Sequence, residues 1–386
     1  MVKGGNKIWR RRIHRLLWAA FCCSGTALAQ DGYWINGAGG NWSVTANWDP
    51  ADGMAGGADN TAYFGFAREA AIAANATFTI SGAQTIGNLC FTTQGGPAGW
   101  SFNPGAGGSL MLAATFGPPQ ITVTSPSLQV SLNVVVAGGS GVAKDGPGTL
   151  VLTAQNTYAG PTLVTGGALN VTGSIGTGKV TVNNATLSGG GVINGPVVIG
   201  AGGTLAPGTA GGPLTINNSL LLLPGSTTSV SLNGHPAVQG LTSITYGGTL
   251  LVNNLSGTVS LGQSFSLFGA GSTSGNFSSI QPSPGPWLRW RFNPATGQIT
   301  VVSSASQPAF ANVGLAGASL VCQITNGPPG SPCSLLAATN LSQPLGSWIP
   351  IATNLFDVSG NVTCTNNFGA NRPGQVYLTT QVIPTP

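Results

Sequence analysis

Ionisable side chains are scarce in this chain. Lys, Arg, Asp and Glu together make up 5% of its 386 residues, and there are two histidines. An average soluble domain has about 25% charged residues. Acid–base catalysis and metal binding both depend on ionisable side chains, so the scarcity argues against an enzyme and against a metal or organic cofactor. Helical patterns are missing as well, because no 3.6-residue apolar period occurs after residue 30.

The excess of basic residues is confined to the start of the chain. Six of the twelve Lys and Arg residues precede Leu16, and the run Leu16–Ala29 is apolar or small. A charged head, an apolar stretch and the ending Ala27-Leu28-Ala29 predict a secretory signal peptide over residues 1–29. The run is too short for the roughly 20 residues of a membrane helix. Its removal leaves six basic beside seven acidic residues, so no membrane span and no nucleic-acid partner are expected.

Glycine is abundant, with 61 residues, and 41% of the chain is hydrophobic. This composition favours many short strands joined by tight turns. A Gly/Ala-x-Leu unit recurs with its leucines at 150, 169, 187 and 205, at steps of 19, 18 and 18 residues. A fixed period with no helical pattern between its members indicates a solenoid.

Apolar positions recur every sixth residue within that period. The series is Leu169, Ile175, Thr181, Leu187, Ile193, Ile199 and Leu205. Three positions per turn predict three strands per turn, with Leu169, Leu187 and Leu205 in one interior column. Hexads also occur in left-handed β-helices, so spacing alone leaves the handedness open.

The rest of the chain also has β-strand patterns. Before the repeat, short runs bounded by Gly, Pro or Asn predict strands at 61–66, 77–81, 89–92, 109–113, 120–124, 128–132 and 134–137. After it, residues 287–292 and 298–302 predict a closing hairpin. The fold expected is all-β: a parallel β-helix over residues 30–302, a linker at 303–316, and a small β-sandwich of about seven strands at 317–386.

One segment resembles a known family. Residues Gly146–Leu152, Asn156–Gly160, Thr162–Thr165 and Gly167–Leu169 are similar to the autotransporter-associated β-strand repeat, also called the passenger-associated transport repeat. Pro161 departs from the usual pattern. The resemblance implies a right-handed parallel β-helix on a secreted or surface protein, without a known catalytic residue. Residues 317–386 resemble, more loosely, a small C-terminal module of verrucomicrobial secreted proteins.

The candidate binding residues are aromatic. Trp34, Trp42 and Trp48 could contact glycan, because flat apolar ring faces stack on sugars, or they could plug the end of the solenoid. A charged pair, Lys144-Asp145, has the residue types of a polysaccharide lyase site but no acidic cluster beside it in sequence. His235, which precedes a proline, is expected to be structural.

Four cysteines follow the predicted signal peptide: Cys90, Cys322, Cys333 and Cys364. Cys322 and Cys333 flank the turn residues Gly327–Gly330 almost symmetrically, so we expect a hairpin with a disulfide across it. Cys364 is a competing partner for either, and buried free thiols are the alternative.

Three functional hypotheses follow. The first is a non-enzymatic, exported stalk or adhesin-like protein at the cell surface or outside the cell. The second is a glycan-binding module, whose partner is a polysaccharide or another cell-envelope component. The third is a protein related to polysaccharide lyases. Residues 317–386 are too few for the translocation barrel of a self-exporting passenger, so we expect another export route or retention in the periplasm.

Overall fold

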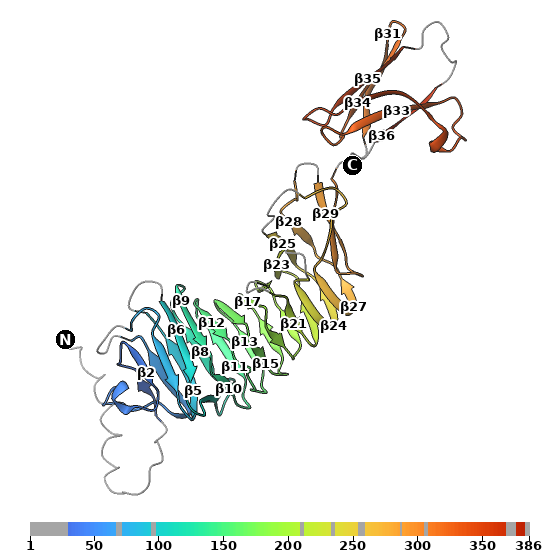
Figure 1. Cartoon of the computed structure of the whole chain (residues 1–386). Helices are drawn as coiled ribbons and strands as arrows, with labels where there is room; N and C mark the ends of the chain where they lie inside the picture. The colour runs from blue at the N-terminus through green and yellow to red at the C-terminus, as the bar shows by residue number, and fades with distance from the viewer. Residues whose placement is uncertain are drawn as a thin grey trace, which may run out of the picture.

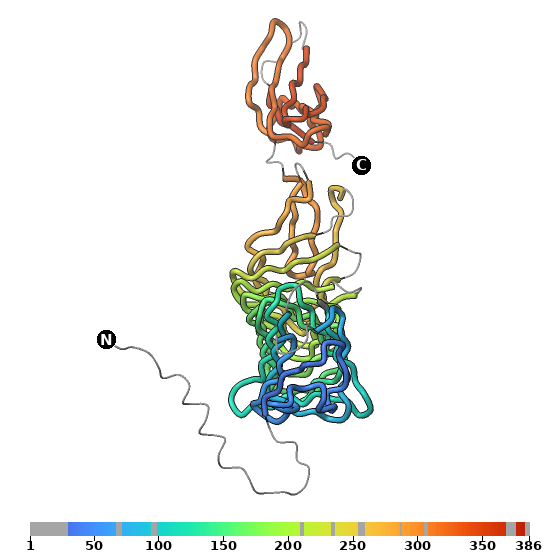
Figure 2. Tube along the Cα trace, turned by 90° about the vertical axis from the view of Figure 1, so that its left-hand side faces the viewer, coloured from blue at the N-terminus to red at the C-terminus, as the bar shows by residue number. Residues whose placement is uncertain are grey.

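The structure is a computed structural model that describes residues 30–66, 72–93, 98–208, 212–232, 236–253, 259–285, 288–304, 308–367 and 376–382. The predicted signal peptide and His235 lie outside these ranges. The described residues contain strands and two short 3-10 turns but no α-helix. Strands stack turn upon turn into a long solenoid, and a second body follows at the C-terminal end (Figures 1 and 2).

Two parallel sheets form the solenoid. The 11-stranded sheet contains β2 (Gly39–Asn41), β4 (Thr77–Ile80), β6 (Ala98–Pro104), β9 (Leu128–Leu132), β12 (Thr149–Leu152), β14 (Ala168–Val171), β17 (Thr186–Gly189), β20 (Thr204–Pro207), β23 (Thr227–Ser231), β25 (Thr249–Asn253) and β28 (Ser279–Gln281). The 16-stranded sheet contains β1 (Gly32–Tyr33), β3 (Gly57–Phe64), β5 (Ala83–Phe91), β7 (Ser109–Leu112), β8 (Gln120–Val123), β10 (Val135–Ala137), β11 (Val142–Asp145), β13 (Thr162–Val164), β15 (Ser174–Ile175), β16 (Val180–Val182), β18 (Val192–Ile193), β19 (Val197–Ile199), β21 (Leu214–Ile216), β22 (Ser219–Leu222), β24 (Val238–Tyr246) and β27 (Phe268–Gly275).

The larger sheet covers two faces of the solenoid. Its long strands join them: β5 pairs with β7 through its first half and with β8 through its second. Strand β24 does the same with β21 and β22. Each turn of the central region therefore has three strands, as the hexad spacing predicts. The all-β parallel solenoid expected from the repeat is confirmed.

The interior column of leucines is also confirmed. Leu169 pairs in register with Leu187, which pairs with Leu205, and all three are fully buried. The hexad predicts an inward-facing side chain at Thr181, and this prediction is wrong, because Thr181 faces outward. Alternation along β16 directs its two flanking residues, Val180 and Val182, into the core.

The outer side of the same sheet has a column of small, mostly hydroxylated residues. They are half-buried and paired in register from turn to turn: Thr149, Ala168, Thr186, Thr204, Thr227, Thr249 and Ser279. The surface of this face is therefore polar without being charged.

An antiparallel sheet covers the C-terminal end of the solenoid. It comprises β26 (Ser264–Ser266), β30 (Gln298–Ser303) and β29 (Leu288–Asn293). The pairing of β29 with β30 confirms the closing hairpin, of which Trp287 lies outside the described residues. Phe292 packs on Tyr246 and Phe277 of the last turns, with ring centroids 4.8 and 5.0 Å apart. This covering protects the last turn from pairing with another chain.

The C-terminal module has two three-stranded antiparallel sheets. One contains β31 (Ala309–Ala316), β32 (Ser319–Thr325) and β35 (Val362–Asn367), and the other contains β34 (Ile349–Leu355), β33 (Pro332–Ala338) and β36 (Tyr377–Val382). The expected linker at 303–316 is too long, because β31 pairs with β32 and so belongs to the module. Residues 303–316 resemble a linker in sequence because many of them are small, and almost all of β31 is exposed.

We expect Leu187→Ala to lower the free energy of unfolding by about 2–5 kcal/mol, since the change leaves a cavity between two in-register leucines. The matched control is Thr186→Ala on the outer side of the same strand, where the expected change is below about 0.5 kcal/mol. Urea unfolding of both variants measures the difference. Equal effects of the two substitutions would contradict the interior column.

Thr228 continues the leucine column, opposite Leu205 and Leu250, and is fully buried. Its hydroxyl has no hydrogen-bond partner. Thr228→Val keeps the shape and removes the unpaired polar group, so we expect it to raise the free energy of unfolding by about 1 kcal/mol. A lower urea midpoint for this variant would show that the hydroxyl is satisfied in solution.

Candidate functional site

Within the repeat, residues 156–160 form a buried, hydrogen-bonded turn in the middle of the solenoid. Asn156 is buried, and its side-chain oxygen accepts the N–H of Val136 at 2.9 Å. Its amide donates to the carbonyls of Ala154 and Ser174, both at 3.0 Å. Val136 belongs to the preceding turn and Ser174 to the following one, so this amide joins three turns.

Tyr158 and Gly160 complete this turn. The Tyr158 ring is buried, and its hydroxyl pairs with the Thr162 hydroxyl at 2.9 Å. Burial raises the pKa of Tyr158 to about 12. A Cβ at Gly160 would lie 2.3 Å from the backbone nitrogen of Gly141 in the preceding turn, which leaves room only for glycine. These contacts stabilise the stacking of turns and expose no reactive group.

Lys144 lies inside the solenoid, on strand β11. It pairs in register with Ile121 and Val164 and is fully buried. Its ammonium donates to the backbone carbonyls of Asp145 (2.9 Å), Gly146 (2.8 Å) and Gly166 (3.0 Å). Desolvation lowers the pKa of Lys144 to about 8, against the opposing effect of Asp145.

A pKa near neutrality can mark a catalytic base. Here, however, the Lys144 amine points at the three backbone carbonyls to which it is hydrogen-bonded. The neighbouring Asp145 is exposed and accepts a hydrogen bond from the Thr165 hydroxyl. The pair therefore binds two successive turns together, and it does not present a base to a substrate.

The three N-terminal tryptophans close the first turns of the solenoid. Trp34, Trp42 and Trp48 are 2%, 1% and 1% exposed. Their rings meet edge to face, 5.1 Å apart for Trp34 and Trp48 and 4.9 Å for Trp42 and Trp48. Each indole N–H donates to a backbone carbonyl. No ring face is open to a sugar, so the burial of these residues argues against the possible glycan contact and favours the alternative role, a plug at the end of the solenoid.

The acidic residues near the N-terminus carry the oxygen ligands that calcium prefers. The carboxylate of Asp59, however, already accepts two hydrogen bonds from Thr115, one from the hydroxyl and one from the backbone N–H. These bonds lower the pKa of Asp59. Across the described part of the chain, no three His, Cys, Asp or Glu side chains lie close enough to hold a metal ion.

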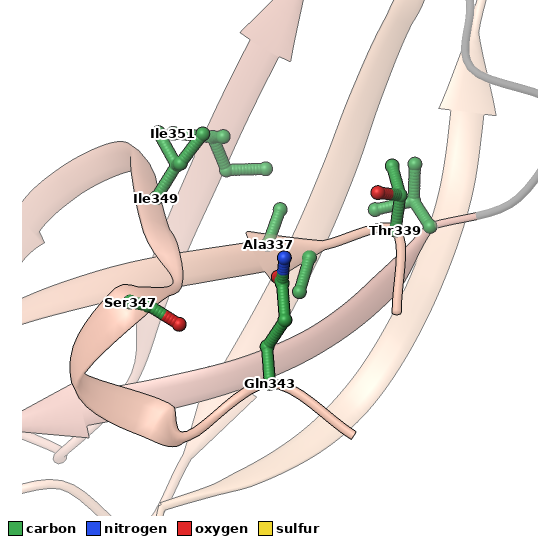
Figure 3. A pocket seen from close by; sticks show the side chains of 8 residues that line it. Ala337, Thr339, Gln343, Ser347, Ile349 and Ile351 are labelled. Atoms are coloured by element: carbon green, nitrogen blue, oxygen red, sulfur yellow. The ribbon is translucent and has the colours of Figure 1, made fainter. Parts of the chain in front are cut away.

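A pocket of about 240 Å³ lies in the C-terminal module (Figure 3). Strand β33 and the turn that leads into β34 form its walls. The lining is Ala337, Ala338, Thr339, Gln343, Ser347, Ile349, Ile351 and Val376. Sequence reasoning missed it, because these residues form no motif. The available signal was Leu341, Leu345 and Ile349, large apolar residues in a segment of turn composition.

The cysteines are arranged differently from the expectation. Residues 327–330 connect β32 of one sheet to β33 of the other, so no hairpin joins Cys322 to Cys333. The hairpin prediction is therefore wrong. Gly327 lies against the Phe356 ring, where a Cβ would clash. Cys322, Cys333 and Cys364 are all buried in the core of the module.

Comparisons with known proteins agree with the repeat. Residues 142–171 match the family model of the passenger-associated transport repeat, which confirms the resemblance seen in the sequence. The chain is 34% identical over 204 residues to an adhesin, the BmaC autotransporter of Brucella suis biovar 1, a match covering 49% of this chain and 6% of that protein. It is 36% identical over 95 residues to an extracellular serine protease of Serratia marcescens, covering 25% of this chain and 9% of the protease.

The chain thus spans less than a tenth of either relative's length. The repeat and both relatives support an exported protein located at the cell surface or outside the cell. A helix long and apolar enough to cross a membrane is absent from the part of the chain that the structure describes.

We expect the stability of the protein to depend on pH through Lys144. Its folded pKa of about 8 lies below the ordinary 10.5, so the unfolded state binds more protons between these values. Stability linked to this group therefore rises with pH across that window. In urea unfolding at pH 7.5 and 9.5, the wild type should gain about 1–2 kcal/mol relative to Lys144→Met. The comparison with the variant cancels the titration of tyrosines and cysteines. An identical pH response of both proteins would contradict a lowered pKa of the buried Lys144.

Proposed function

We propose that this chain is a non-enzymatic, adhesin-like surface protein in which the solenoid is a stalk and the C-terminal module carries the contact surface. The observation that supports this most directly is the unbroken parallel ladder from β2 to β28, covered by aromatic residues at both ends. Such a solenoid has a complete interior of its own and serves to hold other parts at a distance.

The relatives differ in what they suggest. The adhesin shares about half of this chain, whereas the match to the protease is limited to 95 residues. The best candidate base in the solenoid, Lys144, is buried and hydrogen-bonded to three carbonyls. We therefore favour adhesion over proteolysis or polysaccharide cleavage.

The exposed apolar residues support a contact surface on the module. Among the residues that the structure describes, seven of the twelve large exposed hydrophobic side chains belong to the module, although it has about a fifth of the chain: Val313, Leu315, Leu341, Leu345, Ile349, Leu355 and Val358. Three of these, Leu341, Leu345 and Ile349, lie in or next to the turn that lines the pocket. Exposed apolar groups gathered in this way mark interaction sites.

The chemistry of the module suits an uncharged partner. Residues 309–382 contain two charged side chains, Asp357 and Arg372. The pocket combines apolar Ile349 and Ile351 with the amide of Gln343 and the hydroxyl of Ser347. We propose a neutral polysaccharide of a cell envelope as the partner, since its sugars have both apolar faces and hydroxyls.

Adhesion of beads coated with the mature chain to immobilised envelope polysaccharide tests this proposal. The triple variant Leu341→Ser, Leu345→Ser, Ile349→Ser should lose most of the adhesion. Phe116→Ser, which changes a 91% exposed residue on the solenoid, is the matched control and should adhere as the wild type does.

A deletion variant separates the stalk from the contact surface. Deletion of residues 168–185 removes one turn and joins Gly167 to Thr186, the register partner of Ala168. We expect this shorter protein to fold and to adhere. Loss of adhesion in the folded deletion variant, or full adhesion of the triple variant, would contradict the proposed division of roles.

A further inference from the structure

Three buried thiols meet in the core of the C-terminal module. Cys322 lies on β32, Cys364 on β35 of the same sheet, and Cys333 on β33 of the facing sheet. Their side chains are 0%, 1% and 0% exposed. The core around them is small, with Leu320, Ile324, Leu335, Phe356 and Val362 as its other buried members.

Cys364 contacts both of the other cysteines, in different ways. It is directly opposite Cys322 in the antiparallel pairing of β32 and β35. Cys333 faces Cys364 across the interface between the sheets, within the same buried core, and the pKa of each thiol is shifted by the other. Cys364 is therefore the shared partner.

The two candidate pairings differ in geometry. Residues directly opposite on antiparallel strands have Cβ atoms about 4.5–5.5 Å apart. A disulfide needs Cβ atoms about 3.5–4.5 Å apart, so a bond between neighbouring strands must pull them together. Cys333 and Cys364 lie on facing sheets in the same core, so side-chain rotation can bring their sulfur atoms together without moving a strand against its neighbour.

We propose that Cys333 and Cys364 form a disulfide that joins the two sheets of the module, with Cys322 left as a buried thiol. The reaction is an exchange with an external disulfide, such as oxidised glutathione or a dithiol oxidase. One thiolate attacks that disulfide and forms a mixed disulfide. The second thiolate then displaces the remaining half. The two cysteines lose two electrons and two protons, and the external disulfide is reduced to two thiols.

The bond fits both the location and the size of the module. Disulfides persist in exported proteins, and small domains with few core residues depend on them. Burial raises the pKa of the Cys364 thiol, and it raises the pKa of Cys333 to about 11. Few thiolates therefore form in the folded module, and oxidation must precede closure of the core. Once formed, the bond is shielded from reductants.

The sequence allows a direct test by proteolysis. No Lys or Arg lies between Arg291 and Arg372, so trypsin leaves all three cysteines on one peptide. A second protease that cuts before Asp357 separates Cys364 from the other two. Residues 30–386 are refolded with reduced and oxidised glutathione, alkylated, and digested with both enzymes without reduction. Mass spectrometry then shows whether the two fragments stay joined.

We expect the fragments to stay joined in the wild type and in Cys322→Ser, and to separate in Cys333→Ser and Cys364→Ser. Cys90→Ser, in the solenoid, is the control and should behave as the wild type does. Reduction of the wild type should lower the melting temperature of the module by roughly 10 °C or more, because the bond closes a loop of about 30 residues.

Separate fragments from Cys322→Ser would overturn the proposal, since only the Cys333–Cys364 bond can join them in that variant. So would a wild-type protein that releases the Cys364 fragment as a free thiol, whether because Cys322 and Cys333 are paired or because all three are reduced. Joining of the fragments in Cys333→Ser at the wild-type yield would show that Cys322 is the partner, and would equally refute the assignment.

Discussion

Each turn of the solenoid takes its backbone hydrogen bonds from the turns on either side, in register, and the rest of the structure depends on this constraint. Residues of equal phase are stacked directly over one another, so an interior position in one turn is interior in the next. A polar residue at an interior position is therefore buried together with the apolar residues stacked above and below it. Lys144 and Thr228 are in this situation. The lysine is compensated by three carbonyls, whereas the threonine hydroxyl is left unpaired.

The same constraint explains how much of the fold the sequence predicts. Repeating leucines reveal their column, and short alternating runs reveal most strands before the repeat, because both signals are local. Strand β6 was missed, since glycine and proline residues precede its aromatic pair. The failure at Thr181 is also physical: a six-residue step advances from one strand of a turn to the next, but the two-residue alternation within a strand decides which side chain faces inward.

The candidate sites were harder to predict, because their roles depend on contacts that are distant in sequence. Nothing local distinguishes a buried indole from one that binds sugar, and Trp34 is buried because Trp48, Phe64 and Phe78, which are distant from it in sequence, pack against it. Pro328 and Gly330 indicate a turn, but a hairpin and a crossing between sheets use similar turn residues. Cys364 is 31 residues from Cys333 along the chain, and only the sandwich brings them together.

The uncharged outer column of hydroxylated residues has a consequence for the medium in which such a protein can work. Salt screens interactions between solvent-exposed charges. In the stalk role that we propose for the solenoid, a face built on Thr186, Thr204 and Thr249 presents no charges whose interactions salt could screen. The length of such a solenoid is set by the number of its stacked turns, which ionic strength does not change.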